Sequence, residues 1–181
     1  MISYAISDPS TLCFDHLDQD LERFSQQADM ILYRDKKSDH YPHNAKTFLK
    51  RASNYPFDKI LLHSDYQLAK RLGADGVHLT STQFDAIESA KALGLFVIIS
   101  CHSYDEVITA QKYGADMVTF SPIFATPNKG EPLGVAALYR LTLEISIPII
   151  ALGGILTQEH IEQCQIHGAS GFASIRYFQR H

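Results

Sequence analysis

The sequence GADMVTF at residues 114–120 shows a pattern that the chain uses three times, the other copies being GADGVHL at 73–79 and GASGFAS at 168–174. In each copy a glycine follows a helix-like stretch, and a short apolar run begins soon after it. Glycine readily takes the left-handed backbone conformation that ends many helices. We therefore predict a helix end followed by a strand at each copy. The copies start 41 and 54 residues apart, close to two strand–helix units each.

Eight short apolar runs predict the strands. They are nearly continuous rather than alternating, which is typical of parallel strands buried on both faces. The runs cover residues 2–6, 29–33, 59–63, 76–79, 95–100, 116–120, 147–152 and 171–175, with helical patterns between them. We predict an α/β protein, a (β/α)8 TIM barrel that takes up residues 1–181 as a single domain. An open doubly wound sheet, with usually about five or six strands, is the competing fold.

Three polar residues mark predicted helix starts. Asp65 and Thr157 are expected to cap the helices that follow them. Ser103 and Glu106 form a capping-box pattern, in which the glutamate reaches back to the first residue of the motif.

The predicted barrel is compact. The chain has 181 residues, whereas TIM barrels typically take about 250. The last segment, RYFQRH at 176–181, is too short for a full eighth helix. We therefore expect a truncated or missing last helix with its groove covered by a partner chain, as in a homodimer, or a strand count that is one too high.

Composition narrows the class of partner. A net charge of −4 and a pI near 6.1 argue against nucleic acid and anionic membrane partners. No apolar run approaches the length of about 18 residues that a membrane span needs. Three scattered cysteines and the absence of a signal-peptide pattern indicate reduced thiols in the cytoplasm. The expected partner is a small molecule.

Ligands of TIM barrels bind where strands end and lead into helices. Gly153 and Gly154 end the seventh predicted strand, and Arg176 follows the eighth. Many barrels bind phosphate there, because glycine backbone can approach an anion closely. The alternatives are a tight turn for the glycines and a solvated side chain for Arg176.

Cationic side chains occur on the same predicted rim. Arg34 and Lys36 follow the second strand, and Lys129 lies on the long loop SPIFATPNKGEP at 121–132. Together they suit a second phosphate or a pyrophosphate, although each alone could be a surface cation.

Histidines end several predicted strands. His102 is a candidate for proton transfer, and His63 and His78 lie near strand ends, where a hydrogen-bonded structural role is equally typical. No spacing of histidines or cysteines matches a metal site, so none is predicted.

The ordered set of segments resembles the thiamine phosphate synthase and TenI-like superfamily. The most specific part is Pro-Ile-Phe-x-Thr-x-x-Lys at 122–129, which comes before Gly-Gly-Ile at 153–155. The resemblance also includes YAISD, LYRDK, LAKRLGADGVHL, ISCHSYDEV, IPIIALGGI and GASGFASI, so it runs along essentially the whole chain. In the family's synthases, the ring nitrogen of a thiazole phosphate attacks a pyrimidine pyrophosphate. Magnesium neutralises the pyrophosphate that leaves.

The resemblance implies roles for residues of this chain. Pyrimidine pyrophosphate contacts fall on one wall, and thiazole phosphate contacts fall on the long loop and after the last two strands. The candidate set is His102 and Lys129 as catalytic residues; Arg34, Lys36, His63, Ser100, Thr126 and Asn128 as substrate-binding residues; and Gly153, Gly154, Ile175 and Arg176 as phosphate-binding residues.

The chain departs from the synthase pattern at three positions. Leu32 stands where the synthases have a glutamine, and Ser64 and Gln83 stand where they have the two aspartates that bind magnesium. Neither Ser64 nor Gln83 supplies the anionic oxygen that a hard dication prefers. Asp65 is one residue away, but we expect it to cap the next helix. The sequence therefore requires no cofactor, and magnesium enters only under a synthase alternative.

Loss of both carboxylates together with a retained phosphate end resembles the TenI-like branch. Some of its members isomerise a carboxythiazole phosphate with a histidine whose position is Pro122 here, so His102 or His63 would have to substitute for it. The leading hypothesis is a TenI-like protein that binds thiazole phosphate, with tautomerase activity. The alternatives are a thiamine phosphate synthase with altered magnesium ligation and a non-catalytic phosphate-ligand module.

Overall fold

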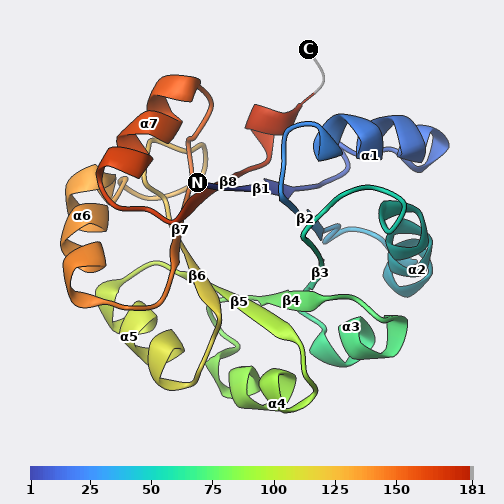
Figure 1. Cartoon of the computed structure of the whole chain (residues 1–181), viewed down its shortest axis with the longest axis horizontal. Coiled ribbons are helices and arrows are strands. Elements are labelled where there is room, and N and C mark those ends of the chain that lie inside the picture. The colour runs from blue at the N-terminus through green and yellow to red at the C-terminus, as the bar shows by residue number, and fades with distance from the viewer. Residues whose placement is uncertain (180–181) are drawn as a thin grey trace.

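Eight parallel strands close into a barrel in the computed structural model, which describes residues 1–179. The strands pair in chain order, and β8 pairs with β1, so the ring has no open edge (Figure 1). This confirms the TIM barrel over the open doubly wound sheet. The strands are β1 (Ile2–Ile6), β2 (Met30–Tyr33), β3 (Lys59–His63), β4 (Gly76–Leu79), β5 (Phe96–Cys101), β6 (Met117–Phe120), β7 (Ile149–Leu152) and β8 (Gly171–Ser174).

Helices surround the strand ring on its outer side (Figure 1). They are α1 (Leu17–Ser25), α2 (Tyr41–Ala52), α3 (Tyr66–Leu72), α4 (Ile87–Ala92), α5 (Tyr104–Lys112), α6 (Gly134–Glu144) and α7 (Gln158–Ile166). Residues 1–179 also contain three short 3₁₀ turns: η1 (Phe14–His16), η2 (Phe84–Ala86) and η3 (Arg176–Phe178). No helix in the described part of the chain is long and apolar enough to span a membrane.

The glycines of the repeated pattern end their helices as predicted. Gly73, Gly114 and Gly168 have φ angles of 76°, 84° and 87°, which lie in the left-handed region. The next strand begins three residues after each of them. The repeat therefore places three helix-to-strand turns at the amino-terminal end of the barrel, opposite the carboxyl ends of the strands.

The predicted helix caps are confirmed, with one correction. The side chains of Asp65, Ser103 and Thr157 each accept a hydrogen bond from the backbone N–H three residues later. The Glu106 carboxylate does not close the box on Ser103. It accepts the backbone N–H of His102 instead, which fixes the start of the loop that carries this histidine.

Side chains alternate between two cores along each strand. One set packs outward against the helices. The other fills the barrel interior, because every second residue of a strand points to the same face. The interior set consists of Tyr4, Ile6, Met30, Leu32, Leu61, Ile98, Ile150 and Ala173. Residues that continue this alternation past the strand ends form the carboxyl rim.

One turn, η3, takes the place of an eighth helix between α7 and α1 (Figure 1). Phe178 is fully buried there, with its ring centroid 6.3 Å from that of Phe24 and 5.9 Å from that of Phe172. The guanidinium of Arg23 lies over the Phe24 ring and donates to the carbonyl oxygens of Phe178 and Thr11. The truncated last helix is confirmed, as is the count of eight strands. The expected homodimer stays a prediction.

Candidate functional site

A cavity of about 340 Å³ opens at the carboxyl ends of the strands. Three cationic side chains and three histidines line it, and no aspartate or glutamate does. Its lining residues are Ile6, Leu32, Arg34, Lys36, His63, His78, Thr80, Ser81, Ser100, His102, Ser121, Pro122, Thr126, Lys129, Leu152, Gly153 and Ile175. The cavity is therefore built to hold negative charge.

The alternation of the strands explains why these side chains meet. Arg34 comes two residues after the interior Leu32, and Ser100 comes two residues after the interior Ile98. Each rim residue therefore faces the same side as the interior residue before it. The apolar side chain of Leu32 lines the cavity at the position where the synthases that this chain resembles have a glutamine.

Arg34, Lys36 and Lys129 form a cationic cluster in the lining of this cavity. None of the three forms an ion pair with a carboxylate of residues 1–179. The pKa of Lys36 is lowered, chiefly by the charge of Arg34 and to a smaller extent by partial burial and by the charge of Lys129. The pKa of His63 is lowered to about 4, chiefly by burial and to a smaller extent by the charges of Arg34 and Lys36. The cluster is thus a concentration of like charge that a bound anion would relieve.

His102 is held by the loop after β6. Its Nδ1 lies 2.8 Å from the carbonyl oxygen of Ser121, which can only accept a hydrogen bond. Nδ1 must therefore carry the proton, which leaves Nε2 of the neutral imidazole as an acceptor. Ser121 precedes Pro122, the position at which the resemblance places the tautomerase histidine. The fold thus puts a different imidazole next to that position.

His78 lies inside the barrel beneath the cavity. Its Nδ1 is 3.0 Å from the Tyr4 hydroxyl, and its Nε2 is 3.1 Å from Ser100 Oγ. Burial lowers the pKa of His78 to about 3, with smaller contributions from His63 and Arg34. The imidazole is therefore neutral at physiological pH, and the chain from Tyr4 to Ser100 orients the serine hydroxyl at the cavity wall.

A second cavity of about 360 Å³ adjoins the first and shares Thr126, Leu152, Gly153 and Ile175 with it. Gly153 and Gly154 have φ angles of 98° and 69°. A Cβ at Gly153 would lie 2.7 Å from Pro122 Cα, and one at Gly154 would lie 2.6 Å from the carbonyl oxygen of Ala125. Only glycine fits either position, because both the space and the backbone conformation exclude a side chain.

Most predicted site residues lie together, and one does not. The first cavity holds Arg34, Lys36, His63, Ser100, His102 and Lys129, and the second holds Gly154 and Arg176, with Thr126, Gly153 and Ile175 in both. Asn128 lines neither cavity and is exposed at a φ of 60°. Its contact with thiazole phosphate stays a prediction.

The candidate set left out four polar residues that line the first cavity: His78, Thr80, Ser81 and Ser121. A signal was available for His78, Thr80 and Ser121, since each of these three continues the inward alternation of its strand. His78 in particular pairs in register with His63 of the neighbouring strand. Applying the two-residue period to all eight strands would have found them.

Magnesium, which the family resemblance implies, does not fit the donor groups present. Ser64 has a φ of 70°, and Asp65 Oδ1 accepts the Leu68 N–H as a helix cap. Gln83 offers an amide oxygen that already accepts two hydrogen bonds from Thr80. Within residues 1–179, no group of three His, Cys, Asp or Glu side chains is placed to hold a metal ion.

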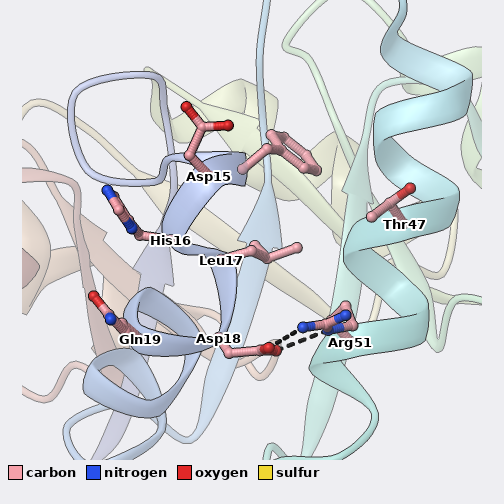
Figure 2. Close-up of a pocket in the computed structure, with 8 residues that line it drawn as sticks. Asp15, His16, Leu17, Asp18, Gln19, Thr47 and Arg51 are labelled. Atoms are coloured by element: carbon pink, nitrogen blue, oxygen red, sulfur yellow. Dashed lines mark hydrogen bonds and ion pairs between the residues drawn. The ribbon is translucent and has the colours of Figure 1, made fainter.

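A hollow of about 250 Å³ lies outside the barrel between α1 and α2 (Figure 2). Its arginine, Arg51, is engaged in a two-point ion pair with Asp18, donating from Nε at 2.8 Å and also from Nη2. Asp15 and His16 complete its polar lining beside Gln19 and Thr47. Because Arg51 is already paired with Asp18, this hollow has no unpaired lysine or arginine in its lining, unlike the rim cavity.

Comparison with known proteins identifies the family of this chain. A family model described as thiamine monophosphate synthase matches residues 3–178. The chain belongs to the thiamine monophosphate synthase family. A family relative named thiamine-phosphate synthase, from Halalkalibacterium halodurans, is 33% identical over 171 residues, which are 88% of this chain and 81% of the relative.

Other thiamine monophosphate synthase relatives match over a shorter part. Relatives from Geobacter sulfurreducens and Aquifex aeolicus are 38% and 36% identical over 122 residues, about two thirds of this chain. The match spans only 57% and 65% of the length of these two proteins.

Among solved structures, thiamine phosphate pyrophosphorylase from Pyrococcus furiosus superposes with a TM-score of 0.81. The alignment covers 96% of this chain and 85% of that one at 24% sequence identity. N-acetylmannosamine-6-phosphate 2-epimerase from Clostridium perfringens gives a TM-score of 0.70 at 17% identity, covering 98% of this chain and 87% of that one. At these identities the likeness shows the barrel fold alone.

Proposed function

We propose that this protein binds a thiazole phosphate at the carboxyl rim of the barrel and catalyses a tautomerase-like proton transfer on it. The proposal places the reaction in cytoplasmic thiamine biosynthesis. One observation carries it: a glycine-walled cavity and a cation-lined cavity meet, and an imidazole with a free acceptor nitrogen lines the cationic one.

The two joined cavities suit a ligand with two anionic groups. Gly153 and Gly154 allow a phosphate to approach their backbone, and their N–H groups donate to no acceptor among residues 1–179. The cationic cluster at the other end suits a second anion, such as the carboxylate of a carboxythiazole phosphate. A ligand with one phosphate and one carboxylate would therefore bind along the line that joins the two cavities.

His102 is the group we assign to proton transfer. Its Nδ1–H donates to Ser121, so the lone pair of Nε2 can take a proton from the thiazole ring. Tautomerisation removes one proton and returns one at another atom of the same ligand, so it needs no oxidant, reductant or co-substrate. Lys129 on the loop 121–132 would stabilise negative charge that develops when the proton leaves.

A thiamine phosphate synthase activity is the second candidate. Arg34, Lys36, Lys129 and Ser100 on one wall favour it, because they suit a pyrophosphate leaving group. The name of the relative from Halalkalibacterium halodurans favours it as well. The absence of carboxylates from the lining of the rim cavity argues against its usual metal chemistry.

The test compares two substrates on one protein preparation. Carboxythiazole phosphate alone should be isomerised, as followed by the change in ultraviolet absorbance. The pyrimidine pyrophosphate and thiazole phosphate pair should give no thiamine phosphate. EDTA-sensitive formation of thiamine phosphate would reverse the ranking of the two activities.

Substitution of the proton-transfer residue sharpens this test. His102→Gln should abolish isomerisation while thiazole phosphate still raises the melting temperature, because the phosphate end is unchanged. Wild-type isomerisation in this variant would disprove the role of His102. If neither reaction occurs but thiazole phosphate still stabilises the protein, the chain is a binding module. If thiazole phosphate gives no stabilisation, the ligand assignment itself fails.

A further inference from the structure

Gln83 joins the loop after β3 to the loop after β4. Its side-chain Nε2 donates to the backbone oxygen of Ser64 at 3.1 Å. Its Oε1 accepts from the backbone nitrogen and the hydroxyl of Thr80, at 2.9 and 3.1 Å. Both ends of the amide are therefore engaged, and the two loops are tied by a neutral side chain.

These loops carry the two positions at which the resemblance places metal-binding carboxylates. The positions are Ser64 and Gln83, and the hydrogen bond from the Gln83 amide connects them directly. A metal ion would perform the same link by binding a carboxylate from each loop. Here the link is made without any charge.

The neighbouring carboxylate does not compensate. Asp65 lies beside Ser64, yet its Oδ1 caps α3 at 2.8 Å from the Leu68 nitrogen, and it does not line the cavity. Negative charge in the cavity must therefore come from the ligand. The positive charge that opposes it comes from Arg34, Lys36 and Lys129, which have no carboxylate partner in residues 1–179.

We propose that this protein binds a diphosphate or similarly charged anion with Arg34, Lys36 and Lys129 alone, the Gln83 amide replacing a metal ion as the link between the two loops. The proposal rests on the proposed function, because it assigns the charge-neutralising groups of that same site. Arginine suits the task, since its planar fork can bind two oxygens of one phosphate group. The lysines act as more mobile point charges.

The experiment measures binding of inorganic pyrophosphate by calorimetry, in EDTA and in magnesium chloride. We expect binding in EDTA that magnesium does not strengthen, because magnesium screens the charge of the free anion. Binding that EDTA abolishes, or that magnesium tightens about tenfold or more, would overturn the proposal. Arg34→Gln should weaken binding in EDTA by about tenfold, whereas Arg140→Gln, an exposed arginine on α6, should leave it unchanged. Equal effects of the two would also overturn it.

A gain-of-function variant tests the role of the amide link. Ser64→Asp combined with Gln83→Glu introduces one carboxylate on each loop, and Asp tolerates the positive φ at residue 64 better than most residues. This double variant should bind Mn²⁺, seen as loss of the free-ion signal in electron paramagnetic resonance, while the wild type should not. Stoichiometric Mn²⁺ binding by the wild type would contradict the proposal.

The outcomes separate this proposal from the proposed function. Pyrophosphate reports on the cationic cluster, whereas stabilisation by thiazole phosphate reports on the glycine end. If pyrophosphate binding depends on metal while thiazole phosphate still stabilises the protein, only the proposal of a metal-free anion site is disproved. If pyrophosphate binds without metal while thiazole phosphate does not stabilise the protein, only the proposed function is disproved.

Discussion

Acid should destabilise this protein through His78, and the size of the effect follows from its burial. The pKa of His78 is lowered from 6.5 to about 3 in the folded chain, chiefly by burial. The unfolded chain therefore takes up this proton first, and stability is lost as the pH falls from 6.5 towards 3. Linkage gives a loss of about 2 kcal/mol between pH 7 and pH 5 from this one group.

Urea unfolding at pH 7 and at pH 5 measures this loss. In His78→Gln the free energy of unfolding should fall by about 2 kcal/mol less between the two pH values than in the wild type. Any constant cost of the substitution cancels in this difference. His16→Gln, which removes an exposed histidine outside the barrel, is the control and should behave as the wild type does. Equal falls in the wild type and His78→Gln would refute the inference that His78 is buried in its neutral form.

Two further predictions concern the two ends of the site. Gly154→Ala should cost about 2 kcal/mol or more in the free energy of unfolding, because its Cβ would meet Ala125 at a positive φ. Gly94→Ala has a similar φ but open space around it, and should cost less; equal losses would contradict the steric argument. At the cationic end, saturating pyrophosphate should raise the pKa of His63 from about 4 by offsetting Arg34 and Lys36, as seen in proton NMR. An unchanged pKa of His63 would place the anion elsewhere.

The barrel could be predicted from the sequence because its signals are local. A glycine after a helical stretch, as at Gly114, and a cap such as Asp65 depend on a few neighbouring residues. The order of strands then follows from chain order, since each parallel neighbour is reached by one helix. The placement of Arg34 and Gly153 on one rim needs only the rule that strand ends meet there.

Features that depend on packing between distant segments could not be predicted in the same way. Phe178 fills the place of a helix by packing against Phe172 and against Phe24, and Phe24 lies at the other end of the chain. The hydrogen bond from Gln83 to Ser64 depends on how the loops after β3 and β4 are placed relative to each other, which no local sequence pattern specifies. Asn128 matches a family position in sequence, but its side chain lines neither cavity, although Pro127 and Lys129 on either side of it do.

The position of the turn η3 also indicates where a tag or a fusion partner should be attached to this protein. Arg176 and Gln179 line the glycine-walled cavity, so a domain held next to them would lie beside the proposed ligand site. Ile2 begins β1 at the opposite end of the barrel, where the strands start. Tags, surface anchors and fusion partners therefore belong on the amino-terminal side. A domain held close to residue 179 would stand beside the cavity in which we propose that the ligand binds.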